Sequence, residues 1–254
     1  MKRNVFLTVF AVLMILNLSN LFAQDIVSIN KLEDLEQNEV EAITHEHSDI
    51  FVHPFFSHMA LADKPGEASF RFTGIQRKEG QNLSNDFGLH IEAGLLPGLG
   101  LHLRTDGIKN ETFSEAMLMY NVFTSDNENF GISIFGQLSI PTGKMSNNIY
   151  KGLFGVGIKK AFPSFVVFNG DIHYDPKDDM AEYEASFVFK ASELLYPIIE
   201  TRGEITRNGT SVYLLPAIKF RIQENQTIGT GFQIALVDER EYDVEAVLQY
   251  GIEF

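Results

Sequence analysis

The chain has 254 residues, a formal net charge of −14, 22 phenylalanines and no cysteine. The absence of cysteine excludes disulfide bonds, thiolate metal sites and a cysteine nucleophile. The acidic balance argues against a nucleic-acid partner, because binding of phosphates needs a basic face.

The first 23 residues have the pattern of a secretory signal peptide. Lys2 and Arg3 form a basic start, residues 5–16 are an apolar run, and Ala23 is a small residue suited to cleavage. We therefore expect a signal peptide over 1–23, with an uncleaved anchor as the alternative. No later stretch has the 18 apolar residues that a membrane-spanning helix requires.

Residues 24–65 form a separate acidic stretch, with nine acidic residues against two lysines. Its few apolar side chains cannot repay the entropy cost of folding alone, which predicts an N-terminal arm. The more apolar residues 50–61 are expected to dock onto another part of the chain and to plug it.

From residue 66 to the end, apolar and polar residues alternate with a period of two. The last residues show this best, because seven alternate positions from Tyr242 to Phe254 are apolar. Such alternation predicts strands with one apolar face. The expected strands, about twelve in number, lie at 68–73, 87–93, 99–104, 113–123, 130–140, 150–160, 165–174, 181–190, 195–205, 211–222, 227–237 and 242–254.

An even number of strands of this length is typical of an antiparallel transmembrane β-barrel in the outer membrane. The connections agree in part: long polar ones are expected at 77–85, 105–112 and 141–149, and tight ones at 96–98, 162–164 and 191–193. Long loops at one end and short turns at the other are typical of such barrels, with both termini in the periplasm.

Charged residues of both signs recur on the less apolar face, which suits a polar lumen. A soluble periplasmic ligand-binding β-barrel, which would also alternate, remains the alternative fold. The residues expected to point into the lumen include Arg71, His90, Glu92, His102, Arg104, Glu200, Arg202, Lys219 and Arg221.

Two resemblances to known families support the membrane barrel. The C-terminal Tyr250, Ile252 and Phe254 resemble the assembly signal of Gram-negative outer-membrane barrels, which implies outer-membrane lipid and the barrel assembly machinery as partners. The run from Gly131 to Lys144, with its Pro-Thr-Gly, resembles an outer-membrane "transporter" family associated by name with the meta pathway of phenol degradation.

Histidines are concentrated in the acidic arm, where His45, His47, His53 and His58 lie within 14 residues of one another. Imidazole together with carboxylates suits a divalent ion such as Zn²⁺ or Cu²⁺. Solvated or docking histidines are the simpler interpretation, because the spacing fixes no geometry.

No motif for catalysis or cofactor binding is present, so no enzyme is predicted. Twelve strands with long charged side chains inside predict a narrow channel or transporter for small solutes. A metal-handling barrel and a structural barrel without cargo remain open.

Overall fold

The computed structural model describes residues 52–106, 113–125, 128–141, 150–162, 165–237 and 242–254. Twelve strands form within these residues. They are β1 (Ala68–Glu79), β2 (Asn82–Leu96), β3 (Leu99–Asp106), β4 (Phe113–Thr124), β5 (Phe130–Pro141), β6 (Lys151–Phe162), β7 (Val166–Asp175), β8 (Met180–Phe189), β9 (Leu195–Ile205), β10 (Thr210–Gln223), β11 (Gln226–Ala235) and β12 (Val244–Glu253).

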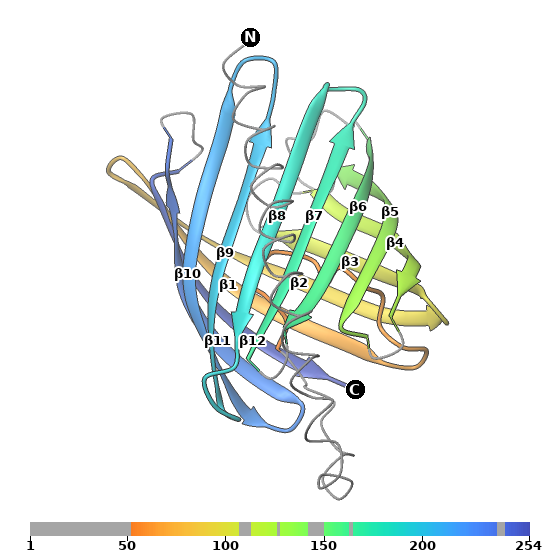
Figure 1. Ribbon diagram of the computed structural model, residues 1–254. Helices are drawn as coiled ribbons and strands as arrows, with labels where there is room; N and C mark the ends of the chain where they lie inside the picture. Colours follow the sequence, from red (N-terminus) through yellow and green to blue (C-terminus); the bar gives the residue numbers. More distant parts are fainter. Residues whose placement is uncertain (1–51, 107–112, 126–127, 142–149, 163–164, 238–241) are drawn as a thin grey trace, which may run out of the picture. The chain divides into compact units, whose positions relative to one another are not determined.

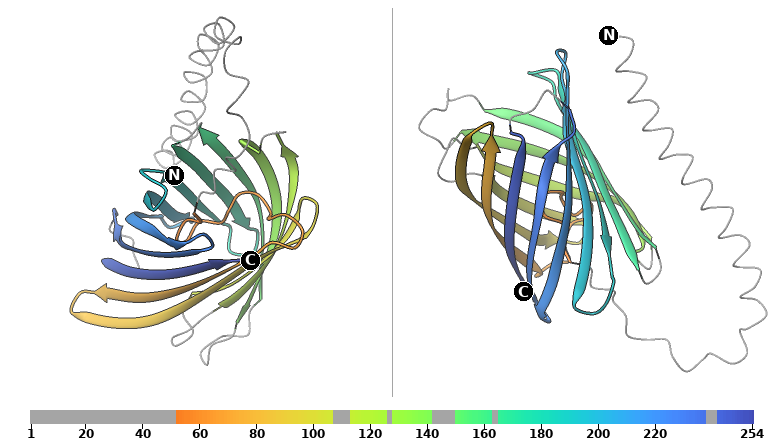
Figure 2. Two further views of the ribbon diagram at one scale, coloured as in Figure 1. Left: turned by 90° about the horizontal axis from the view of Figure 1, so that it is seen from below. Right: turned by 90° about the vertical axis from the view of Figure 1, so that its left-hand side faces the viewer.

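The strands form a closed barrel in which each strand pairs antiparallel with its neighbours in the sequence (Figures 1 and 2). The barrel closes between β1 and β12, where Ser69 is opposite Glu253 and Lys78 is opposite Val244. Closure removes the two free edges that would otherwise leave backbone groups unpaired. The predicted antiparallel barrel of twelve strands is therefore confirmed. No helix long enough and apolar enough to cross a membrane occurs in the described part of the chain.

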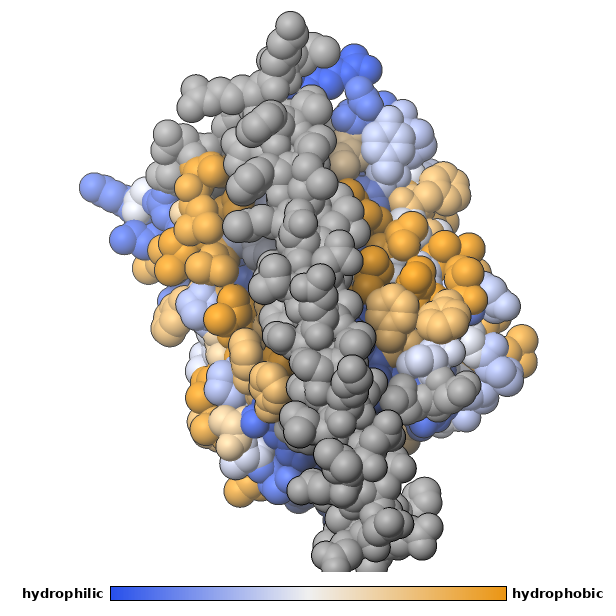
Figure 3. Space-filling model, in the orientation of Figure 1, coloured by the Kyte–Doolittle hydropathy of each residue, from blue (hydrophilic) through white to orange (hydrophobic). Residues whose placement is uncertain are grey.

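The outer face of the barrel is apolar. Large side chains stand exposed at alternate positions, for example Phe72 at 54%, Leu118 at 53% and Phe154 at 68%. Figure 3 shows hydrophobic residues gathered on the visible wall and hydrophilic ones toward its ends. So much exposed apolar surface would be unfavourable in water and fits the hydrocarbon layer of a membrane.

Exposed aromatic residues lie at or near strand ends. Tyr120 and Phe123 lie near the end of β4, Tyr150 precedes β6, and Phe165 precedes β7. Rings at this level suit the boundary between lipid and water, a role that tryptophan, absent from this chain, often fills.

Of the connections predicted from the sequence, one is confirmed and another is wrong. Pro97 and Gly98 alone connect β2 to β3, and Gly98 has φ +74, the left-handed conformation that glycine adopts without strain. The prediction of a long loop at 77–85 was wrong, because β1 and β2 continue to a two-residue turn at Gly80 and Gln81. Polar side chains there are exposed, yet their backbones stay paired. The loops expected at 105–112 and 141–149, and the turn at 162–164, fall mostly outside the described residues.

Candidate functional site

The chain before β1 runs through the lumen of the barrel. We call residues 52–64 the plug segment; in Figure 2 it is the orange trace inside the barrel. Val52, Phe55 and Phe56 are buried and pack with inward residues of the wall, among them Tyr196 and Leu215. Residues 1–51, which include the expected signal peptide, most of the acidic arm, His45 and His47, lie outside the described residues.

The carboxylate of Glu200 on β9 anchors the tip of the plug segment. Its Oε2 accepts a hydrogen bond from the Phe55 N–H at 3.0 Å, and its Oε1 accepts one from the Phe56 N–H at 2.8 Å. The N–H of Ser57 also donates to Oε1. Three successive N–H groups around one carboxylate form an anion-binding nest, which satisfies the charge that Glu200 buries.

The carbonyl groups of the same stretch are held by buried cationic and amide side chains. Lys219 Nζ donates to the carbonyl oxygens of His53 at 2.7 Å and Pro54 at 3.1 Å. Gln249 Nε2 donates to the Phe55 oxygen at 3.0 Å, and Arg104 Nη1 donates to the Phe56 oxygen at 3.2 Å. The backbone of the plug segment is thus paired on both its donor and its acceptor side.

Glycines of the wall make room for the second half of the plug segment. A Cβ at Gly94 would lie 2.0 Å from the Lys64 oxygen, and one at Gly100 would lie 2.9 Å from the Ala62 Cβ. A Cβ at Gly131 would meet the Leu61 side chain at 2.5 Å. The plug segment therefore occupies space that side chains at these wall positions would fill.

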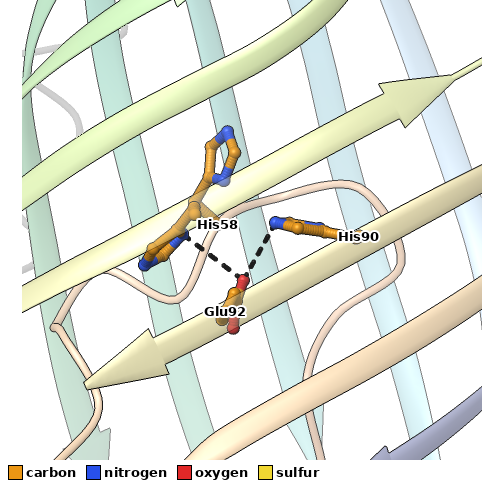
Figure 4. A group of neighbouring side chains, drawn as sticks. His58, His90 and Glu92 are labelled. Carbon is orange, nitrogen blue, oxygen red and sulfur yellow. Dashed lines mark ion pairs between the residues drawn. The ribbon is translucent and has the colours of Figure 1, made fainter. Parts of the chain in front are cut away.

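Near the plug segment, Glu92 on β2 is the centre of a group of imidazoles and one guanidinium. Glu92 Oε2 lies 2.9 Å from His53 Nδ1, and Glu92 Oε1 lies 3.2 Å from His90 Nε2 and 3.5 Å from His102 Nδ1. Arg71 also pairs with Oε1. Figure 4 shows His90 and Glu92 on the wall with His58 beside them.

Two titratable groups of the plug segment have shifted acidities. Burial, together with the positive charge of Arg104, holds the pKa of His58 well below its usual value, so its imidazole is neutral at pH 7. Burial and the negative charge of Glu92 raise the pKa of the Asp63 carboxyl to about 6. Both shifts arise because the segment is packed inside the barrel.

Within the described residues, two groups of side chains have the composition and spacing to hold a metal ion. One consists of His58, His90, Glu92 and His102, and the other of His53, Asp63 and Glu92. In each group the donor atoms lie within 4.8 Å of one another. Four histidines were expected to bind metal. Two of them, His53 and His58, lie beside wall residues that were expected only to line the lumen.

The sequence-predicted lumen residues all lie on the inner face of the wall. Arg202 and Arg221 are half-buried, and the others are buried: Arg71, His90, Glu92, His102, Arg104, Glu200 and Lys219. Of the expected assembly signal, Tyr250, Ile252 and Phe254 lie on the outer face, and the Phe254 ring contacts that of Phe70 at 5.6 Å.

Sequence reasoning missed two features of the site. It did not assign Glu200 to the Phe55–Ser57 backbone, because no local pattern links residues so far apart. It also overlooked a usable signal, the inward Gly-x-Gly pairs at Gly155 and Gly157 and at Gly229 and Gly231, which mark places where the wall leaves space.

No known family model and no curated protein matches the chain. Solved structures of outer-membrane porins and channels do match. The KdgM porin in complex with disordered oligogalacturonate has a TM-score of 0.57 and 8% identity over 73% of this chain and 98% of that one. The NanC porin has a TM-score of 0.58 and 10% identity over 73% and 98%. An outer membrane channel from Pseudomonas putida F1 has a TM-score of 0.57 and 10% identity over 83% and 100%.

At these identities the likeness shows the fold, which is that of outer-membrane porins. The resemblance of the terminal strand to outer-membrane barrels agrees with this result. The second resemblance, to the family associated by name with phenol degradation, is not confirmed, since no family model matches.

Proposed function

We propose that this chain is an outer-membrane channel for small solutes whose lumen is closed by the plug segment. The observation that carries the proposal is the combination of a polar inner wall with an internal segment seated on it. Lumen side chains such as Glu92, Glu200 and Lys219 are at most 1% exposed. An open water-filled pore would leave them accessible, so this arrangement corresponds to a closed state.

The charges of the inner wall indicate what class of solute would pass. Buried acids of the inner wall pair with bases, as in Arg71–Glu92, Arg77–Glu245 and Arg104–Glu184. Paired charges leave no broad path of one sign. The KdgM porin is described in complex with disordered oligogalacturonate, whereas this lumen favours small solutes of either sign or none.

The location follows from the same features. The apolar outer face and the porin fold support the outer membrane, and the pattern of residues 1–23 supports export through a cleaved signal peptide. Ala68 and Phe254 are hydrogen-bonded to each other, so the start of β1 and the end of the chain lie at the same end of the barrel. We assign this end to the periplasm.

Planar bilayer recordings test the channel. The mature full-length chain is expected to give low conductance, and a variant lacking residues 24–64 is expected to conduct more. In the full chain, Glu200→Gln should raise conductance as well, because it weakens the anchor of the plug segment. Absence of conductance in all three proteins would refute the channel, and porin-like conductance of the unaltered chain would refute the plug.

A further inference from the structure

Four side chains in the lumen, His58, His90, Glu92 and His102, form a site apart from the contacts that Glu200 and Lys219 make with the plug segment. His90 and Glu92 lie two residues apart on β2 and share its inner face, and His102 on β3 is directly opposite Glu92. His58 reaches the same place from the plug segment. All four are buried, and their donor atoms lie within 4.8 Å of one another.

The three imidazoles surround a common centre. The ring centroids are 5.4 Å apart for His58 and His90, 5.7 Å for His58 and His102, and 6.1 Å for His90 and His102. In a tetrahedral zinc site, with bonds of about 2.0–2.1 Å, the ligand atoms are about 3.3 Å apart. The donor atoms, which lie within 4.8 Å of one another, would need to approach by up to about 1.5 Å to reach this separation.

The second observation is an unsatisfied nitrogen. His58 is 2% exposed and its Nδ1 has no hydrogen-bond partner among the described residues, although buried polar atoms nearly always have one. His102 Nδ1 likewise lacks a hydrogen bond within the described part of the chain, and lies 3.5 Å from Glu92 Oε1. Buried, unpartnered imidazole nitrogens beside a carboxylate are what a metal ion would satisfy.

The nearby positive charge does not prevent a cation from binding. Arg71 pairs with Glu92, but it also donates to the Pro54 oxygen at 3.1 Å, so it keeps a partner if Glu92 Oε1 turns to an ion. Asp63 contributes a second carboxylate next to Glu92. Arg104 is engaged by Glu184 at 3.6 Å. With Glu184 counted beside Arg104, three carboxylates lie against two guanidinium groups around the site.

We propose that His58, His90, His102 and Glu92 bind one divalent ion of the Zn²⁺ type, which ties the plug segment to the wall of the barrel. Imidazole and carboxylate ligands suit ions of this class. Three ligands come from paired strands and are held rigidly, and the fourth comes from a segment that the barrel does not need for its own pairing. The role of the ion in keeping a channel closed rests on the proposed function. The binding of the ion to these four side chains does not.

Calorimetric titration of the detergent-purified full chain with Zn²⁺ alone tests the site. We expect one ion per chain, and a loss of affinity of at least about 100-fold in His58→Gln and in His102→Gln, because losing a ligand costs more than losing an outer partner. His58 is outside the strands, so its replacement leaves the wall intact. A heat-modifiable shift on mildly denaturing gels verifies that each variant has folded.

The matched control replaces His45 and His47 with Gln and should bind Zn²⁺ as the unaltered chain does. Zn²⁺ should also slow amide exchange of residues 55–62 in the unaltered chain and leave it unchanged in His58→Gln. No binding, equal binding by the His58 and His102 variants, or loss of binding in the His45/His47 control would overturn the proposal. These readouts do not involve conductance, so failure of the channel would be seen separately.

Discussion

Glu200 Oε1 lies 2.6 Å from Ser57 Oγ, although 143 residues separate the two in the sequence. The same carboxylate also receives backbone N–H groups of the plug segment. One buried charge of the wall therefore fixes where the plug segment turns. Because that charge is 1% exposed, its hydrogen bonds are protected from competition by water.

Replacing Glu200 by Gln should loosen the plug segment without disturbing the barrel. The amide keeps one acceptor oxygen but loses the charge and turns an NH₂ group toward backbone donors. We expect the seated state to lose about 1.5–3 kcal/mol, the value of hydrogen bonds to a charged group. Amide exchange of residues 55–57 should accelerate accordingly. Glu204→Gln, at an exposed position of the same strand, is the control, and equal exchange in both variants would contradict the assignment.

Gly94→Ala should displace the end of the plug segment by overpacking. The new methyl group would lie 2.0 Å from the backbone oxygen of Lys64, which cannot rotate away. Overpacking of this kind costs about 1–3 kcal/mol. The expected result is a larger open fraction in single-channel recordings. Gly136→Ala, where a Cβ meets no described atom within 4 Å, should behave as the unaltered chain, and a closed Gly94→Ala channel would argue against this seat.

Phe254→Asp should block assembly into the outer membrane. Phe254 is 67% exposed on the outer face, and its ring lies 5.6 Å from that of Phe70 on β1. A charged residue there would face lipid and would remove the terminal aromatic residue of the expected assembly signal. Fractionation should find the variant in the periplasm as degraded chain, while Phe254→Tyr assembles normally. Normal outer-membrane amounts of the aspartate variant would refute the signal.

Tyr242 gives a prediction at alkaline pH. It precedes β12, accepts a hydrogen bond from Arg202 at 2.8 Å and donates one to Gln233 at 2.9 Å. Burial raises the pKa of Tyr242 to about 12, although the positive charge of Arg202 opposes this shift. The folded chain thus holds this proton more tightly than the unfolded chain, whose tyrosines titrate near pH 10.

The stabilisation that Tyr242 provides through this shift is complete below about pH 10 and is lost as the pH rises through about 12. Two pKa units correspond to about 3 kcal/mol. The difference between the 295 nm titrations of the unaltered chain and Tyr242→Phe should show one phenol ionising near pH 12. A difference curve centred near pH 10 would show that the ring is not buried as described.

The alternation of residues was sufficient to predict the wall of the barrel. In β12, Leu248 and Tyr250 face outward and Gln249 faces inward, as a period of two requires. The inward direction of Arg71 and Glu92 could be inferred in the same way, because side-chain direction in a strand depends only on position. The predicted end of β1 was wrong. Polar residues such as Lys78 and Glu79 indicate exposure to water, but they do not indicate whether the backbone is paired with a neighbouring strand.

The sequence by itself determined the class of fold, the two faces of each strand and the polar character of the lumen, because these follow from local periodicity. Only the tertiary structure decided that Glu200 holds Ser57 and that His58 meets His90 and His102. These contacts join a segment without regular structure to distant strands. Their position depends on closure of the barrel, which brings distant strands together and which no short stretch of residues encodes.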